Sequence, residues 1–290
     1  MGLLGNPNLT IITVSHNSSD SIGDFVASFL KQHPEPRFRD EIEFIFIENS
    51  DDRSITESIA PLQRAGFPVK LIFTENKGFG TACNVGADEA AGRYLAFVNP
   101  DLTFATSLDA LTQYHKTDTW GTVRQHNGNG HNYSLDLLPE HKGLLYEIFM
   151  GVRFVNLMPA LFIHKCYIIG SFFWVDKNLF TRVGRFNERF FLYYEEAELS
   201  RRLNCYSNPV ILDEIYVNHE GFGSHAGVYK AKNHQWDGFV EYCNITRQPH
   251  LFYRACKTLR FLARFSASAT YSLNVLSAKE SQICPREEPT

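Results

Sequence analysis

Apolar and polar positions alternate in blocks along the first hundred residues. Short β-branched or aromatic runs predict buried strands at 9–15, 42–47, 69–73 and 94–98. Between them, apolar residues at helical spacing predict helices at 21–30 and 55–64, and a run of small residues predicts a closely packed helix at 80–91. This strand–helix alternation is typical of an α/β fold with a doubly wound, mostly parallel sheet.

Polar clusters follow each of these strands. They lie at 16–17, 48–52, 75–78 and 99–101. Parallel strands end at one edge of their sheet, and ligands bind in the crevice beyond those ends. The clusters are therefore expected to converge on one rim.

The alternation stops after residue 105. Asn-Gly pairs within 120–138 predict a hairpin, and 168–175 predicts a further strand. Short helices are expected at 177–183 and 195–203. We therefore divide the chain into a catalytic domain, an amphipathic helical segment and a flexible tail. Their bounds are 1–245 (with halves at 1–104 and 105–245), 246–276 and 277–290.

Composition narrows the function classes. The 290 residues carry 28 Lys plus Arg against 32 Asp plus Glu, and this net charge of −4 disfavours a protein that coats nucleic acid. The six cysteines form no metal or redox motif. No apolar stretch reaches the ~20 residues of a membrane span, and no secretory signal is recognised. A cytoplasmic protein, placed in the bulk or at the inner face of the membrane, is expected.

Seven motifs occur in an order that resembles the inverting glycosyltransferases of family 2, in the branch of rhamnosyl-, galactosyl- and galactofuranosyl-transferases. They are TIITVSHN (10–17), FIENSDD (46–52), NKGFGTACN (76–84), FVNPD (97–101), GSFFWV (170–175), FNERFFLYYEEAELSRRL (186–203) and HEGFGS (219–224). The resemblance implies a GT-A fold with an added acceptor region and C-terminal helices. It also implies a nucleotide-diphospho-sugar donor, UDP- or dTDP-linked, and Mg²⁺ or Mn²⁺.

The resemblance places the metal at the acidic motif after the fourth strand. Here that motif is Asn99-Pro100-Asp101, in which only Asp101 keeps a carboxylate. His219 is the candidate second ligand. The alternatives are that Asp101 caps a turn and that His219 is an ordinary loop histidine.

The same resemblance makes Glu196 the general base, because an ionised carboxylate can accept the proton of the acceptor hydroxyl. Glu195 is expected beside the acceptor. The alternative is that these acidic residues only stabilise the first turn of a helix through its dipole.

Nucleotide contacts are implied for the polar residues that follow the first strands. They are Ser15, His16, Asn17, Glu48, Asn49, Asp51, Asn76, Lys77, Gly78, Asn99 and Asp101. Asp51 is the expected partner of a pyrimidine N–H, and Lys77 is expected to face phosphate. Gly78 is expected to let the backbone approach the ligand closely. The alternative for 48–52 is a turn that caps the following helix.

Aromatic residues near the acidic helix are candidates for the acceptor site. Trp174 and Tyr194 could stack on a sugar ring, or could belong to the core. The acceptor is expected to be a saccharide or a lipid-linked saccharide of a bacterial surface polysaccharide. The basic amphipathic helix predicted at 251–265 could contact a membrane surface, or pack on its own domain.

Two other functions stay open. A sugar nucleotidyltransferase usually carries a glycine- and arginine-rich loop after its first strand, whereas residues 15–20 contain no glycine, lysine or arginine. A sugar-nucleotide-binding or scaffold protein without catalysis is consistent with the reduced motif at Asn99-Pro100-Asp101.

Overall fold

A computed structural model describes residues 7–127, 130–142, 155–219 and 228–247. The predicted helix at 251–265 and the predicted tail lie outside these residues. In the first half of the chain the elements are β1 (Leu9–Ser15), α1 (Ser19–Gln32), α2 (Phe38–Glu41), β2 (Ile42–Glu48), α3 (Ile55–Arg64), β3 (Val69–Phe73), α4 (Phe79–Glu89) and β4 (Tyr94–Val98). All four predicted strands and all three predicted helices of this half are confirmed, within two residues at each end.

Shorter elements follow in the second half. They are β5 (Leu102–Phe104), α5 (Asp109–Thr112), β6 (Trp120–Asn127), β7 (Gly130–Asn132), β8 (Leu135–Leu137), a 3₁₀ turn (Pro139–His141), α7 (Pro159–Phe162), a second 3₁₀ turn (Ile163–Lys165), β9 (Cys166–Ile168), β10 (Phe172–Asp176), α8 (Lys177–Arg182), α9 (Glu195–Leu203), β11 (Val210–His219) and α10 (Val228–Thr246). The predicted hairpin is confirmed as β6 and β7. The single strand predicted at 168–175 is wrong, because β9 and β10 are separate strands in different sheets.

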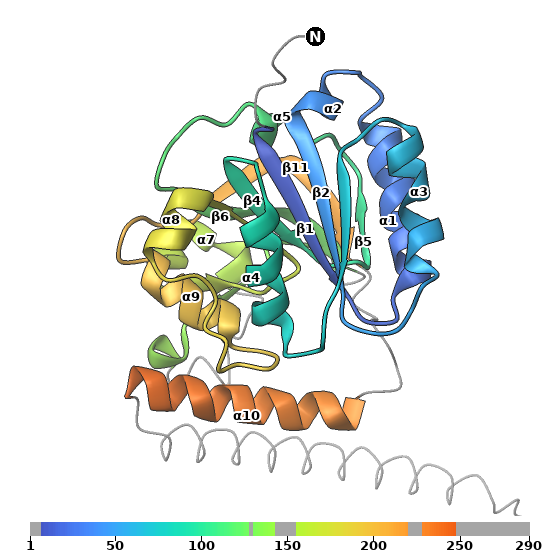
Figure 1. Cartoon of the computed structure of the whole chain (residues 1–290). Coiled ribbons are helices and arrows are strands. Elements are labelled where there is room, and N and C mark those ends of the chain that lie inside the picture. Colours follow the sequence, from blue (N-terminus) through green and yellow to red (C-terminus); the bar gives the residue numbers. More distant parts are fainter. Residues whose placement is uncertain (1–6, 128–129, 143–154, 220–227, 248–290) are drawn as a thin grey trace, which may run out of the picture.

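One nine-stranded sheet runs through the molecule in the order β3-β2-β1-β4-β10-β6-β11-β5, with β7 beside β6 (Figure 1). The first four strands are parallel. β10 is antiparallel to both β4 and β6, and β11 is parallel to β6. Six strands (β1, β2, β3, β4, β6 and β11) therefore point the same way and end at one edge, which we call the carboxyl rim.

Two apolar layers cover the sheet. Phe25 and Phe29 of α1 pack edge-to-face on Phe46 and Phe44, with ring centroids 6.2 and 4.8 Å apart. On the other face, α4 lies tightly on β1, because a Cβ atom at Gly86 would lie only 2.6 Å from Ile12 Cγ2. The small residues of α4 are therefore what allows this approach, as the sequence predicted.

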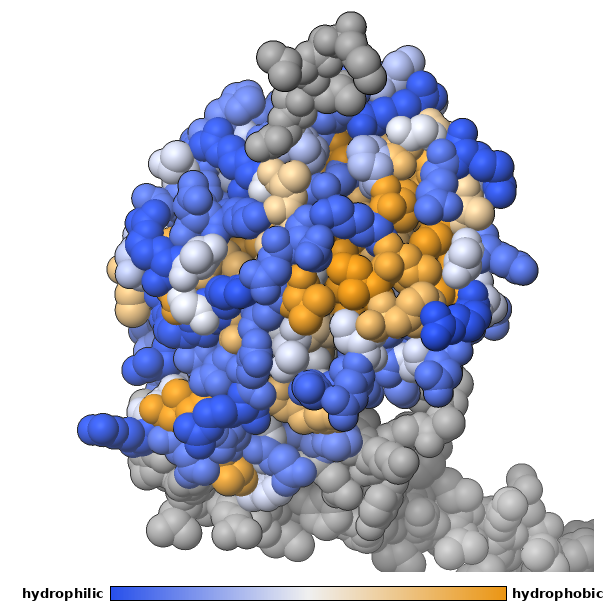
Figure 2. Space-filling model, viewed as in Figure 1, coloured by the Kyte–Doolittle hydropathy of each residue, from blue (hydrophilic) through white to orange (hydrophobic). Residues whose placement is uncertain are grey.

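The edge strand β3 is less well covered. Its apolar side chains Val69, Leu71 and Ile72 are only half-buried. Figure 2 shows apolar residues at the surface in the region between α4 and α3, whereas most of this face is hydrophilic. Among the helices of the described ranges, none combines the length and the apolar character that a bilayer span requires.

Candidate active site

The ends of β1 and β2 form one wall of the carboxyl rim. Ser15 and Glu48 are fully buried there. One carboxylate oxygen of Glu48, Oε1, accepts hydrogen bonds from the backbone N–H groups of Ser50 (2.9 Å) and Asn17 (3.4 Å). The carboxamide of Asn49 accepts a hydrogen bond from the Thr74 hydroxyl at 2.6 Å. Glu48 and Asn49 therefore tie the loops after the first three strands together.

The acidic cluster after β2 divides into a paired and an exposed residue. Asp52 accepts hydrogen bonds from the Ser19 hydroxyl and from the Ser54 backbone N–H, which lies 2.9 Å away. Both bonds lower the pKa of Asp52, and the bond from the Ser19 hydroxyl has the largest effect. Asp52 thus closes the turn before α3, while Asp51 and His16 are exposed on the rim.

The loop after β3 differs from its predicted role at one position. Asn76 and Lys77 are exposed, and Lys77 Nζ lies 3.2 Å from a Glu75 carboxylate oxygen. Gly78 is buried and has a left-handed φ of 107°. A Cβ atom there would lie 2.5 Å from the Phe191 carbonyl oxygen, so the close approach is to the protein's own backbone. The prediction that Gly78 opens the loop to a ligand is therefore corrected.

Strand pairing brings Asp101 and His219 together. β5 begins just after Asp101, and its Leu102 is the register partner of His219 at the end of β11. Asp101 Oδ1 lies 3.4 Å from His219 Nε2. This oxygen is buried and accepts no hydrogen bond from the described part of the chain. A carboxylate and an imidazole facing each other are suitable ligands for a first-row divalent metal such as Mn²⁺.

The protein's own contribution to such a metal site is small. Within the described ranges, no group of three or more His, Cys, Asp or Glu side chains gathers in a way that could hold an ion. Asn99 stands where a second carboxylate is usual in the resembling family, and its backbone N–H donates to the Ser171 carbonyl at 2.9 Å. A metal at Asp101 and His219 would therefore need further ligands from a bound diphosphate or from water.

The acidic pair Glu195 and Glu196 opens α9, with exposed fractions of 3% and 9%. Burial raises the pKa of Glu195 well above its usual range, and the charge of Glu196 is the second largest cause of this shift. Burial also raises the pKa of Glu196, although hydrogen bonds from its own backbone and that of Gly170 and from Glu195 oppose this shift. Burial therefore favours the protonated form of both carboxyl groups, and the ionisation of either one disfavours that of the other.

The acidic pair and the Asp101–His219 pair are connected by a short segment of backbone. A Cβ atom at Gly170 would lie 3.9 Å from Glu196 Oε1. The next residue, Ser171, accepts the N–H of Asn99, two residues before Asp101. Both pairs therefore face the same part of the rim.

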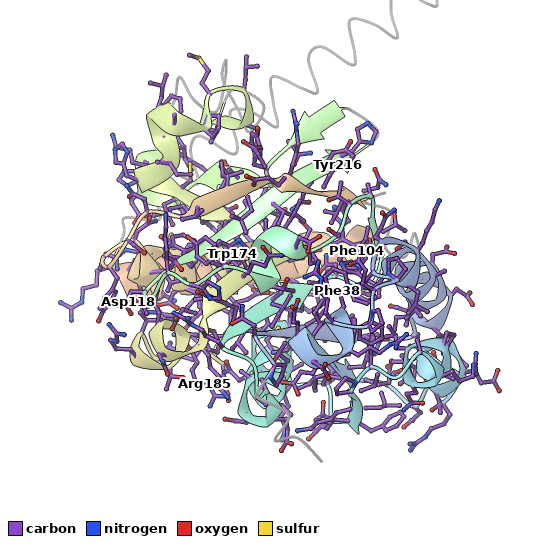
Figure 3. The ribbon with its side chains drawn as sticks, turned by 90° about the horizontal axis from the view of Figure 1, so that it is seen from above. Phe38, Phe104, Asp118, Trp174, Arg185 and Tyr216 are labelled. Atoms are coloured by element: carbon purple, nitrogen blue, oxygen red, sulfur yellow. The ribbon has the colours of Figure 1, made fainter. Side chains whose placement is uncertain are left out.

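Trp174 does not belong to the acceptor site. It is fully buried in β10, and its ring lies 5.1 Å from Tyr114 and 6.0 Å from Tyr94. Its Nε1–H donates to the Thr122 carbonyl at 3.3 Å. Figure 3 shows Trp174 near the centre of the molecule, with Asp118 and Arg185 at its periphery. The predicted stacking of Trp174 on a sugar is wrong, because this side chain is part of the core.

One polar cluster at the rim was missed by the sequence reasoning. Gln125, at the end of β6, is 1% exposed and its Oε1 accepts the hydroxyl groups of Ser134 and Ser171, both at 2.7 Å. Its Nε2 is buried and lacks a partner in the described ranges. A signal was present, because an amide ends an otherwise strand-like run. Without the direction of β6, however, this residue could not be assigned to the rim.

The fold and the rim define a glycosyltransferase of the GT-A type. Residues 10–184, more than half of the chain, match the family described as glycosyl transferase family 2. The chain belongs to this family, as its motifs predicted.

Similar proteins are consistent with that assignment. The chain is 23% identical over 211 residues to the low-salt glycan biosynthesis hexosyltransferase Agl10 of Haloferax volcanii, and the match covers 67% of this chain and 61% of that protein. The chain thus spans less than two thirds of this curated relative.

Three solved structures share the fold. The mannosyltransferase PcManGT of Pyrobaculum calidifontis, in complex with GDP-Man and Mn²⁺, is 12% identical with a TM-score of 0.63, and covers 96% of this chain and 80% of its own. GalNAc-T7, with UDP, GalNAc and Mn²⁺, is 14% identical with a TM-score of 0.58, and the match covers 82% of this chain and 48% of that one. TarS of S. aureus is 18% identical with a TM-score of 0.53, and the match covers 73% of this chain and 36% of that one.

Proposed function

We propose that this protein is an inverting, metal-dependent hexosyltransferase that moves a sugar from a nucleotide-diphospho-sugar to a hydroxyl group. The acceptor is a saccharide or a lipid-linked saccharide of a surface polysaccharide, and the reaction takes place on the cytoplasmic side of the membrane. The observation that carries this proposal is the arrangement of two pairs on one rim. Gly170 lies against the Glu196 carboxyl, and the next residue, Ser171, pairs with Asn99 near the facing Asp101 and His219 side chains.

Asp101 and His219 are the residues that would hold Mg²⁺ or Mn²⁺. When bound, such an ion supplies positive charge that neutralises the leaving diphosphate. The mixed nitrogen and oxygen donors favour Mn²⁺ over Mg²⁺, because Mg²⁺ prefers oxygen ligands. Mn²⁺ with a sugar nucleotide is also what PcManGT contains.

Glu196 is the proposed general base. It accepts the proton of the acceptor hydroxyl as that oxygen attacks the anomeric carbon from the face opposite the leaving group, which inverts the configuration. Burial raises the pKa of Glu196, and its carboxylate form is therefore a stronger base than an exposed carboxylate. Glu195, with Tyr194 next to it, is proposed to lie against the acceptor.

The nucleotide is proposed to occupy the wall formed by the ends of β1, β2 and β3. The exposed side chains of His16, Asp51 and Lys77 could reach the base and the phosphates from there, with Lys77 exchanging Glu75 for phosphate. The buried hydroxyl of Ser15 accepts and donates no hydrogen bond within the described ranges, and therefore has capacity for a ligand. A membrane contact through residues 251–265 remains part of this proposal, since a lipid-linked acceptor would benefit from it.

A thermal-shift screen against UDP-, dTDP- and GDP-sugars, with and without Mn²⁺, tests the proposal directly. A selective increase in Tm that needs Mn²⁺ is expected for one donor class, because a ligand that binds only the folded state stabilises it. The same donor should then be consumed in the presence of an acceptor. Stabilisation without any donor turnover would favour the alternative of a binding protein without catalysis, and no stabilisation by any sugar nucleotide would contradict both.

A further inference from the structure

The segment that leads into the acidic helix has an unusual backbone. We call Phe190–Tyr194 the entry segment. Tyr193 and Tyr194 have φ values of 71° and 72°, in the left-handed region that residues other than glycine and asparagine rarely adopt. Two such residues in succession persist only when the surrounding structure holds them there. The next residues along the chain are Glu195 and Glu196.

The loop before α4 holds the entry segment from one side. The N–H of Phe79 donates to the Phe191 carbonyl at 2.9 Å. A Cβ atom at Gly78 would lie 2.5 Å from that oxygen and 2.8 Å from the Phe191 Cα. Backbone therefore meets backbone at this contact, with no room for a side chain.

Helix α10 holds the entry segment from the other side. A Cβ atom at Gly238 would lie 2.3 Å from the Tyr193 carbonyl oxygen and 3.2 Å from that of Leu192. The Tyr194 ring also packs against Phe239 of this helix, with ring centroids 5.5 Å apart. Figure 1 shows α10 running along the carboxyl rim, beneath α9 and α4.

An ion pair completes this contact at the start of the segment. Arg189 Nη2 lies 2.6 Å from Glu241 Oε1 on α10. The entry segment is thus enclosed between two glycine contacts that come from elements about 160 residues apart in sequence. Neither glycine touches the carboxyl groups themselves.

We propose that Gly78 and Gly238 are positioning residues, and that α10 acts through the Tyr193 carbonyl to fix the orientation of the Glu195–Glu196 pair. The catalytic use of that pair rests on the proposed function, but its placement by α10 does not. A side chain at position 238 must displace either the Tyr193 backbone or α10, and in both cases the first turn of α9, which begins just after Tyr194, loses its present support. The pair then loses its present contacts with Gly170 and with each other.

The test compares Gly238→Ala with Gly23→Ala in the full chain. Both replace a glycine inside a helix, which by itself favours the helix. Gly23 has no atom within 4 Å of its Cβ position, so it serves as the matched control. The readout is the midpoint pH at which the infrared carbonyl band of the protonated buried carboxyl disappears. The band is assigned to the pair by its loss in Glu195→Gln. Cys83, Tyr167 and Tyr193 are other titratable groups that face the pair, and the band separates its titration from theirs.

We expect Gly238→Ala to move this midpoint by about one pH unit, as altered hydrogen bonding and burial do, and Gly23→Ala to leave it unchanged. Turnover of the donor found in the thermal screen should fall by about ten- to a hundredfold, because a misplaced catalytic group costs rate, with binding of that donor and of Mn²⁺ retained. If Gly238→Ala does not fold, Glu241→Gln removes the Arg189 ion pair without adding atoms, and a smaller shift in the same direction is expected.

Equal midpoints in the folded Gly238→Ala variant and in the Gly23→Ala control would overturn the proposal. If Glu241→Gln is measured instead, an unchanged midpoint in that variant would overturn it. The two proposals fail in different ways. If Glu196→Gln kept full transfer activity while Gly238→Ala shifted the midpoint, the positioning by α10 would stand and the catalytic assignment of Glu196 would not.

Discussion

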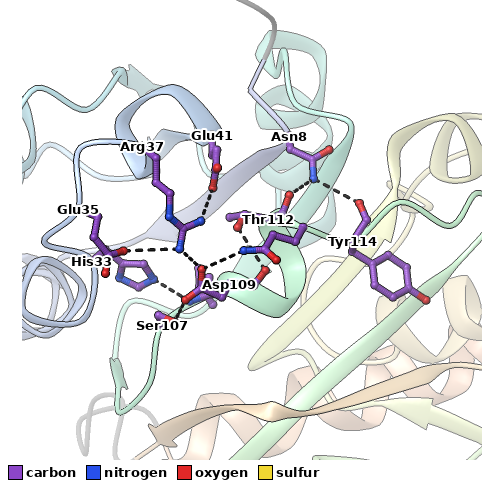
Figure 4. Close-up of polar contacts among 11 residues, drawn as sticks. Asn8, His33, Glu35, Arg37, Glu41, Ser107, Asp109, Thr112 and Tyr114 are labelled. Atoms are coloured by element: carbon purple, nitrogen blue, oxygen red, sulfur yellow. Dashed lines mark hydrogen bonds and ion pairs between the residues drawn. The ribbon is translucent and has the colours of Figure 1, made fainter.

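The two ends of the central sheet carry polar clusters of opposite character. At the amino end, Asp109 accepts hydrogen bonds from Arg37 and from the Ser107 hydroxyl, and Arg37 also lies 3.2 Å from Glu41 (Figure 4). His33 is equally well satisfied there, because its Nε2 accepts the Leu108 N–H at 2.8 Å and its Nδ1 lies 2.7 Å from the Phe29 carbonyl.

At the carboxyl rim, several buried polar atoms make no hydrogen bond in the described ranges, although Asp101 Oδ1 faces His219 Nε2 at 3.4 Å. These polar atoms are Ser15 Oγ, Glu48 Oε2, Asp101 Oδ1, Gln125 Nε2, Glu195 Oε2 and Glu196 Oε2. A buried polar group without a hydrogen bond costs about 1–3 kcal/mol. The comparison teaches that the cluster around Asp109 and His33 is built for stability, although the nearby Tyr114 hydroxyl is also without a hydrogen bond in the described ranges. The rim, in contrast, retains capacity for a ligand at the expense of stability. Four predictions test this contrast.

The largest effect is expected for Glu196→Gln. The amide keeps the size of the side chain but cannot accept the proton, so donor turnover to the acceptor should fall by about 10²- to 10⁴-fold. Binding of the donor, measured by thermal shift, should be nearly unchanged. Glu57→Gln, at an exposed position of α3, is the matched control and should keep full activity. Full activity in Glu196→Gln would remove this residue from the mechanism.

The next effect compares one carboxylate from each end. Asp101→Asn should weaken Mn²⁺ binding by roughly tenfold or more, since each 1.4 kcal/mol of lost binding is a factor of ten. Asp109→Asn should leave Mn²⁺ binding unchanged and instead lower Tm, because Arg37 loses one of its ionised partners. Mn²⁺ titration calorimetry on both variants distinguishes them. Equal Mn²⁺ affinity in the two variants would mean that Asp101 is not a ligand.

A pH effect is expected from the amino end. Burial lowers the pKa of His33 from 6.5 to about 4. The unfolded chain therefore binds the proton more readily, and stability falls as the pH drops below about 6.5. Between pH 7 and pH 5 the loss from this residue should be about 2 kcal/mol, at 1.36 kcal/mol per pK unit.

Denaturant unfolding at the two pH values measures this loss, with His33→Gln as the variant that cannot titrate. The pH-dependent loss should be smaller in His33→Gln by the amount assigned to His33. A histidine NMR titration should also find His33 neutral at pH 5. A midpoint for His33 near its usual value would contradict the assignment.

The smallest effect is expected for a rim carboxylate that is paired. Asp52 lies in the middle of the rim, but its carboxylate is hydrogen-bonded to Ser19 and Ser54. In this respect it resembles the paired residues of the amino end. Asp52→Ala should lower Tm slightly and leave sugar-nucleotide binding intact. If it instead abolished binding while Asp51→Ala did not, the distinction between paired and unpaired rim residues would fail at this position.

The sequence could predict the parallel half of the fold because its signals are local. Strand β1 (Leu9–Ser15) and helix α3 (Ile55–Arg64) have the predicted bounds, since an apolar period and a following polar or glycine stop define each one. The rim itself followed from the common direction of these strands. The proximity of Asp101 and His219 came from the family resemblance, and the pairing of β5 with β11 explains it.

What could not be predicted depends on tertiary pairing. Gly170 and Ser171 interrupt the apolar run 168–175, but this short break does not by itself show that β9 pairs with β8 whereas β10 pairs with β4. This break places Gly170 beside Glu196. Similarly, Trp174 could be assigned to the core only once β10 was known to lie between β4 and β6.

The pairing of β5 with β11 has a practical consequence for engineering. Because backbone hydrogen bonds between two strands set the distance from Asp101 to His219, the connections that lie between them in the chain do not. Loops such as 113–119 or 204–209, which lead into the amino ends of β6 and β11, could be lengthened or exchanged while the two side chains keep their spacing. Changes within Leu102–Phe104 or at the end of β11, in contrast, would separate them.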